Sequence, residues 1–289
     1  MNRLNKIIVA IVATILFAGC DKNVVEYDTT PIDDATTAQF QLHYMVPTTT
    51  GTANDINKVE LNGQLLTNET TPLSTYNAVP SGAVGRFFAA EAGTVNLKLY
   101  RGAVNDLTLV YDRDFELPGG KHNVIVHDFD EPPIIIDNDA PYPTITTEHS
   151  GTTAWVKFYN LLYEKPGEPT PLRLQYQFQY VTDNNTGTKS EWQNLGSPVA
   201  FGEATGWEPI VVNKTVEISS GYARVDYRIR LIGADGSDEG SLQLFNTASG
   251  EMRDFSDWWT GYVGRVYHHF LAGNRTEAPV ASIRQFTAK

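Results

Sequence analysis

The sequence predicts an all-β protein, built as two antiparallel β-sandwich domains in tandem. Several segments alternate apolar and polar residues with the period of two that places one side of a strand on a core, as Phe40, Leu42 and Tyr44 do. Turn residues separate these segments at short intervals. No stretch of ten or more residues has a convincing helical period. Tyr and Phe, 14 and 13 in number, also favour strands.

Residues 38–130 are predicted to form the first domain. Its first strand starts at Ala38, and the Asn62-Gly63 pair between apolar residues predicts a tight hairpin turn, because these residues accept positive φ angles. Further strands are expected over residues 85–90, 94–100, 107–111 and 123–127.

Residues 131–143 are predicted to be a linker, because prolines and acidic residues are concentrated there. Within the linker, residues 134–136 are expected to pair as an edge strand or to pack the two domains together. Residues 144–289 form the predicted second domain, with strong alternation over residues 172–180 and 225–231. Evenly spaced strands of this kind favour immunoglobulin-like or transthyretin-like sandwiches.

The N-terminus has the three regions of a bacterial signal peptide over residues 1–19. Arg3 and Lys6 precede an apolar run from residue 7 to residue 18. That run is shorter than the roughly 20 residues that a membrane-spanning helix needs. We therefore expect cleavage before Cys20, the single cysteine of the 289 residues.

The cleavage site resembles the lipobox of bacterial lipoproteins, in Leu16, Phe17, Ala18, Gly19 and Cys20. The usual Leu three residues before the Cys is replaced here by Phe17. The resemblance implies lipidation of Cys20 and attachment to the outer membrane, on the periplasmic or the surface-exposed side. Residues 20–37 are polar and acidic without a sustained period, so we expect them to form a tether between the lipid and the fold. The alternative is a secreted protein with a chance cysteine.

Charge and cysteine content exclude several functions. Residues 1–19 hold two basic and no acidic residues, so the remaining chain has 20 Lys and Arg against 34 Asp and Glu, a formal charge of −14. A nucleic-acid partner is disfavoured, because phosphate binding needs a basic surface. With Cys20 lipidated, no cysteine is left for a disulfide.

Each predicted domain begins with an aromatic strand and contains a late segment of glycine, a basic residue and a strand, at residues 120–126 and 264–273. The chain resembles tandem β-sandwich modules of exported lipoproteins known as domain of unknown function 4397, over residues 38–128 and more faintly 153–273. The matching residues are Asn62, Gly63, Ala92, Gly93, Thr94, Gly120 and Lys121. The resemblance implies placement at the cell envelope and a binding or structural role, without catalytic residues.

Residues that could hold a metal or perform acid-base chemistry do not form a known motif. His268 and His269 are neighbours on a predicted strand and point to opposite faces, so they cannot chelate one ion together. Two groups of acids could bind calcium but lack the spacing of a calcium loop: Asp128, Asp130, Glu131, Asp137 and Asp139, and Asp235, Asp238 and Glu239. We predict no catalytic residues, no metal, no cofactor and no enzymatic activity.

The five tryptophans all lie in the second predicted domain, and Trp207, Trp258 and Trp259 stand in polar surroundings. Aromatic rings on loops can stack on sugars or anchor a partner protein. Alternatively, these rings close the ends of the core. The leading hypothesis is a lipid-anchored envelope protein that binds a polysaccharide. The competing hypothesis is a structural, fimbrial or envelope-assembly component that contacts another envelope protein.

Overall fold

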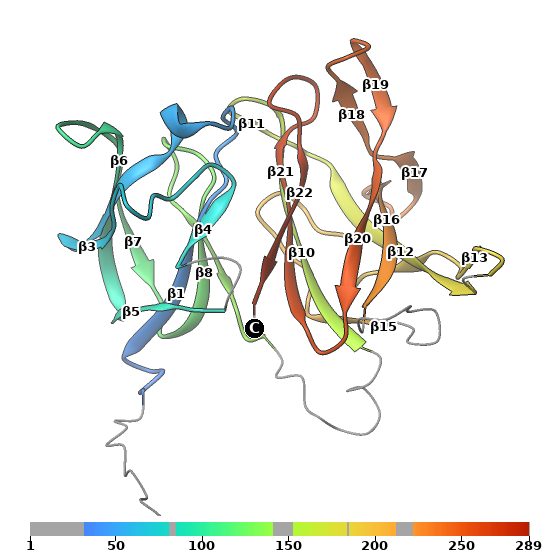
Figure 1. Ribbon diagram of the computed structural model, residues 1–289, viewed down its shortest axis with the longest axis horizontal. Helices are drawn as coiled ribbons and strands as arrows, with labels where there is room; N and C mark the ends of the chain where they lie inside the picture. The colour runs from blue at the N-terminus through green and yellow to red at the C-terminus, as the bar shows by residue number, and fades with distance from the viewer. Residues whose placement is uncertain (1–31, 81–84, 141–152, 184, 212–221, 289) are drawn as a thin grey trace, which may run out of the picture. The chain divides into compact units, whose positions relative to one another are not determined.

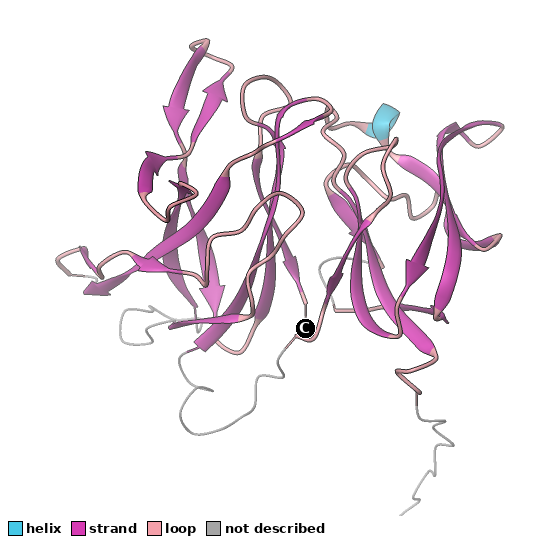
Figure 2. Ribbon diagram, turned by 180° about the vertical axis from the view of Figure 1, so that it is seen from behind, coloured by secondary structure: helices cyan, strands magenta, loops and turns pink. Residues whose placement is uncertain are grey.

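Strands make up nearly all of the regular structure (Figure 2). The computed structural model describes residues 32–80, 85–140, 153–183, 185–211 and 222–288. Within these ranges the one helical segment is a single 3-10 turn, η1 (Thr52–Asn54). The prediction of an all-β protein is confirmed. In the described part of the chain, no helix is both long and apolar enough to cross a membrane.

The first half of the chain forms two sheets. Sheet A contains β4 (Asn77–Val79), β1 (Thr37–Tyr44), β8 (Gly120–Val126) and β9 (Ile134–Asp137) in this order, with β5 (Phe88–Glu91) also paired to β1. Sheet B contains β3 (Gln64–Thr67), β2 (Ile56–Leu61), β6 (Gly93–Ala103) and β7 (Asp106–Leu117). The turn between β2 and β3 has Asn62 at φ 50° and Gly63 at φ 76°, so the predicted hairpin is confirmed.

The second half also forms two large sheets. Sheet C contains β11 (Glu168–Pro169), β10 (Thr153–Lys165), β21 (Val266–Asn274) and β22 (Ser282–Thr287), with β15 (Glu208–Val211) also paired to β10. Sheet D contains β13 (Thr188–Lys189), β12 (Arg173–Asp183), β16 (Tyr222–Ile232) and β17 (Asp238–Ser241), with β14 (Gln193–Asn194) on β12 and β20 (Ser256–Tyr262) on β16. A separate hairpin joins β18 (Gln243–Asn246) to β19 (Glu251–Asp254).

Two pairs of the described strands are parallel, so the expectation of purely antiparallel sheets was wrong. β1 runs parallel to β8, and β10 runs parallel to β21 (Figure 1). Alternation in the sequence shows which face of a strand is buried but does not show the direction of the neighbouring strand. The parallel pairing could therefore not be predicted from the pattern. The two similar segments of the sequence, residues 120–126 and 264–273, contain β8 and β21. Each of these strands pairs in parallel with the first long strand of its half, β1 or β10.

The buried apolar residues form separate clusters between the sheets. Alternate residues of β1, among them Phe40 and Leu42, join residues of sheet B in one cluster, and sheets C and D enclose another. A third cluster joins the other face of sheet A to sheet C through Ile125, Tyr159 and Phe270. All nine residues of β21 are buried, because its two faces contact different clusters.

A buried chain of hydrogen bonds crosses from sheet A to sheet C. The Asn123 side-chain oxygen accepts from His43 Nε2 at 3.0 Å, because an amide oxygen can only accept. The Asn123 amide nitrogen donates to the Tyr159 hydroxyl at 3.0 Å, and this hydroxyl shares a hydrogen bond with His268 Nδ1 at 2.8 Å. All four side chains are fully buried. Such bonds hold two sheets in one relative position, since a shift would leave buried polar atoms without partners.

The predicted linker contains a strand. β9 forms the end of sheet A, as expected of an edge strand, and Ile134 and Ile136 pack on the cluster between sheets A and C. Residues 141–143 of the linker lie outside the described residues. Asp34–Lys289 form one compact unit, and the division into two domains stays a prediction.

Acid is expected to destabilise the protein through its buried histidines. Burial lowers the pKa of His43 to about 4, although its bond to Asn123 acts in the opposite direction. A histidine whose pKa is lower in the folded chain binds a proton more readily in the unfolded chain. The free energy of unfolding is therefore highest above about pH 6.5, where the histidine is neutral in both states, and it falls as the pH drops toward 4. We expect His43→Phe to remove about 3 kcal/mol of the loss in unfolding free energy between pH 7 and pH 4. Urea titrations of both proteins at each pH measure this, and identical pH slopes would contradict it.

Gly273 is expected to tolerate no side chain. It has φ 125° in β21, and an added Cβ would lie 2.6 Å from the Ala281 Cα atom. Gly273→Ala should therefore lower the unfolding free energy by about 2–4 kcal/mol, through backbone strain and overpacking. Gly250→Ala is the matched control, because Gly250 has φ 72° but open space around it, and it should cost about 1 kcal/mol. Equal losses in urea unfolding would show that the close approach to Ala281 is unimportant.

Candidate functional site

The outer face of sheet D is lined with polar and charged side chains. Residues of β12 and β16 alternate, so that Tyr176 and Ile229 enter the core while Gln177 and Arg228 point away from it. Cross-strand partners project from the same face of a sheet. Asp226 of β16 therefore lies between its partners Gln179 of β12 and Trp258 of β20.

Two neighbouring tryptophans of β20 face opposite ways. Trp258 lies on the outer face and is 50% exposed. Trp259 is 6% exposed and belongs to the core between sheets C and D, where its ring centre lies 4.9 Å from that of His269. Within this pair, only Trp258 has a ring that is exposed enough to contact an external ligand.

Arginines stack on two outward tryptophans. The Arg224 guanidinium carbon lies 4.8 Å from the ring centre of Trp258, and the Arg228 guanidinium carbon lies 4.3 Å from that of Trp192. Contacts of this kind contribute about 0.5–1 kcal/mol at exposed positions. They also restrict the motion of both indoles, so the rings are held over the face of the sheet before any ligand arrives.

The Asp226 carboxylate forms ion pairs with two cations. Lys189 Nζ and Arg224 Nε both donate to its carboxylate, the latter at 2.6 Å from Oδ1. Burial alone would raise the pKa of Asp226, but the hydrogen bonds from these cations outweigh burial and lower the pKa below its usual value. The carboxylate is therefore ionised at neutral pH.

These side chains surround a hollow of about 300 Å³, which we call the sheet D hollow. This volume lies at the lower end of the range of small-ligand sites. The side chains that give the hollow its chemical character are Gln179, Lys189, Trp192, Arg224, Asp226 and Trp258. The hollow thus combines two flat apolar rings with charged donors and with carboxylate acceptors, since Asp257 also lines it.

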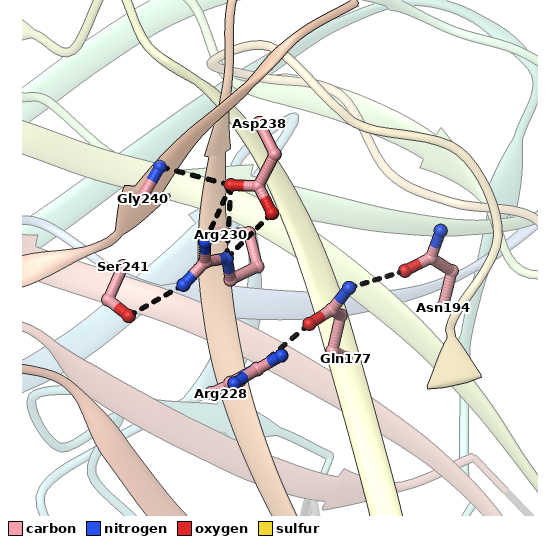
Figure 3. Close-up of polar contacts among 7 residues, drawn as sticks. All are labelled: Gln177, Asn194, Arg228, Arg230, Asp238, Gly240 and Ser241. Atoms are coloured by element: carbon pink, nitrogen blue, oxygen red, sulfur yellow. Dashed lines mark hydrogen bonds and ion pairs between the residues drawn. The ribbon is translucent and has the colours of Figure 1, made fainter. Parts of the chain in front are cut away.

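A network of hydrogen bonds orders the polar face next to the hollow (Figure 3). Arg228 Nε donates to the Gln177 side-chain oxygen at 2.9 Å, and the Gln177 amide donates to Asn194 at 2.8 Å. Arg230 donates three bonds to Asp238 at 2.8–3.1 Å, from Nε to both carboxylate oxygens and from Nη2 to Oδ1. Exposed pairs of this kind stabilise the fold little, so their main effect is to fix side-chain positions.

The sequence-predicted site residues do not form one site. Trp207 is partly buried beside Ala140 and Val266, with its ring centre 5.0 Å from that of His268. Neither Trp207 nor the core residue Trp259 is among the residues that line the sheet D hollow. Cys20 lies outside the described residues.

The histidines and acidic residues considered as metal ligands do not form a metal site among the described residues. His268 contacts the layer between sheets A and C, whereas His269 contacts the core between sheets C and D. Among the described residues, no three His, Cys, Asp or Glu side chains are grouped closely enough to hold a metal ion. Asp238, one of the acids considered for calcium, is engaged by Arg230.

Sequence reasoning missed Lys189, Trp192, Arg224 and Asp226. For Arg224 and Asp226 the signal available was the row of polar residues that alternates with the apolar residues of β16, whereas Lys189 and Trp192 lie outside the long strands and have no such signal. Known proteins add no residues to this set: no family model matches the chain, and a search of the curated proteins finds no match. The resemblance to domain of unknown function 4397 stays a prediction.

The two neighbouring tryptophans should respond differently to truncation. Trp259→Ala removes a buried ring and should lower the unfolding free energy by about 3–5 kcal/mol. Trp258→Ala removes a half-exposed ring and should change it by less than about 1 kcal/mol. Urea unfolding followed by circular dichroism measures both changes, and a larger loss for Trp258→Ala would contradict the assignment of faces.

Proposed function

We propose that this chain is a lipid-anchored cell-envelope protein that binds a surface glycan at the sheet D hollow. The observation that carries this proposal is the pairing of two outward indoles, Trp192 and Trp258, with the charged groups between them. The apolar face of a sugar ring can stack on an indole, while its hydroxyl groups bond to fixed polar groups.

The polar groups of the hollow suit hydroxyl ligands. Asp226 can accept from a sugar hydroxyl, and Lys189, Arg224 and Gln179 can donate to one. Bonds in which one partner is charged are stronger than neutral ones, so a few of them can orient a ligand. Because the cations already contact Asp226, binding requires little rearrangement of the side chains.

The anchor is proposed from the sequence. Lipid on Cys20 would hold the protein at the outer membrane, and the acidic residues 20–37 would separate the sheets from the lipid surface. This arrangement brings a glycan-binding surface close to envelope polysaccharides.

The competing structural role requires a sheet edge that accepts a strand from a neighbour. The longest strand at the end of a described sheet is β7, and it carries the exposed acids Asp112, Asp114 and Glu116. Charged side chains on an edge strand disfavour the addition of another strand. This observation favours glycan binding over assembly.

Native gels that contain soluble polysaccharides test the proposal. We expect at least one polysaccharide to slow the protein, and both Trp192→Ala and Trp258→Ala to reduce the effect at least tenfold in apparent affinity, since stacking on a ring contributes about 1.4 kcal/mol or more. Leu65→Ala is the control, because Leu65 is an exposed apolar residue on sheet B. If no polysaccharide slows the protein, or if the control loses binding equally, the proposal fails.

A further inference from the structure

A second hollow, of about 640 Å³, shares a border residue with the sheet D hollow. It lies where β20, an end strand of sheet D, and β22, an end strand of sheet C, both contribute residues. We call it the edge hollow. Its lining includes Trp258, Thr260, Tyr262, Arg265, Gln285 and Phe286. Trp258 borders both hollows, so the two form adjacent parts of one surface.

The lining of the edge hollow carries a positive charge, although the chain as a whole is acidic. The chain as a whole has a formal charge of −12, yet Arg265 is the one charged side chain among the described residues that line this hollow. Arg224, which stacks on the lining residue Trp258, is paired with Asp226. Arg265 has no carboxylate partner among the described residues.

Arg265 is held in place without being neutralised. It is exposed, and its guanidinium carbon lies 4.6 Å from the ring centre of Tyr262. Burial raises the pKa of the Tyr267 hydroxyl, and the nearby Arg265 guanidinium acts in the opposite direction. A guanidinium stacked on a ring keeps donors at its edge, and its planar fork matches the two oxygens of a carboxylate.

We propose that the edge hollow is a subsite for a carboxylate-bearing sugar, with Arg265 binding the carboxylate. The ligand class is therefore a uronate-containing oligosaccharide. This inference rests on the proposed glycan binding at the sheet D hollow and adds the acidic character of the ligand. A sugar chain that crosses from one hollow to the other passes over Trp258, while Gln285 and Thr260 offer groups for its hydroxyls.

The rest of the lining favours a sugar over an acidic peptide. Beyond Arg265 it consists of aromatic rings, amides and hydroxyls, and no second cation is present among its described residues. A peptide with several acids would need several cations, whereas a sugar polymer offers flat rings and hydroxyls between its carboxylates.

The test uses the full chain in native gels that contain polygalacturonate or alginate, each compared with its methyl-esterified form. Esterification removes the negative charge and leaves the sugar rings in place. We expect at least one acidic polymer to bind about tenfold more tightly than its ester, with added salt weakening only the acidic form. Arg265→Gln should abolish this preference, so that the acidic polymer binds no more tightly than its ester.

Controls separate the charge of Arg265 from general effects. Arg253→Gln removes an exposed cation of β19, which does not line either hollow, and it should keep the preference. Trp258→Ala should weaken both the acidic polymer and its ester, since its ring borders both hollows. Unchanged melting temperatures establish that the variants are folded.

The outcomes distinguish the two proposals. If neutral polymers bind in a Trp258-dependent way and Arg265→Gln changes nothing, the uronate subsite is wrong while glycan binding stands. If neither acidic nor neutral polymers bind, both proposals fail. If polyglutamate binds as tightly as the acidic polysaccharides and also depends on Arg265, the ligand is an acidic peptide and the uronate subsite is overturned.

Discussion

The hydrogen-bonded chain from His43 through Asn123 and Tyr159 to His268 is the constraint on which the arrangement of the sheets depends. Apolar contacts alone would allow sheets A and C to slide, because dispersion and the hydrophobic effect have little directional preference. Buried polar groups do not allow this, since each displaced partner leaves a desolvated donor or acceptor. The chain therefore selects one position of sheet A on sheet C, and the aromatic cluster around Phe270 packs against that position.

The use of both faces of sheets A and C limits where a ligand can bind. Sheets A and C each contribute side chains to two buried apolar clusters, one on either face. Most residues of β1 and β21 are therefore buried and cannot contact a ligand. The outer faces of sheets B and D remain. Sheet B presents the acids of β7, whereas sheet D presents stacked indoles beside paired charges. The proposed binding surface thus follows from the packing that buries the other faces.

The sequence predicts local features well and pairing poorly. The Asn62-Gly63 turn and the buried faces of β12 and β16 follow from patterns within a few residues. The site depends on partners far apart in the chain: Trp192 and Trp258 share a face only because β16 lies between β12 and β20. Alternation places the neighbours Trp258 and Trp259 on opposite faces of the strand. Only the pairing of β20 with β16 determines that Trp259 is the buried one.

The parallel pairs also have a consequence for the order in which the protein can fold. β1 ends at Tyr44, and its central partner begins only at Gly120; β10 ends at Lys165, and its partner begins at Val266. During synthesis from the N-terminus, β1 and β10 can complete these pairs only after β8 and β21 have been made. Pairings this distant form slowly and leave apolar edges open in the meantime. Although β11 and β15 can pair with one edge of β10 early, the other edge stays unpaired until β21 has been made, so formation of β21 and β22 completes sheet C.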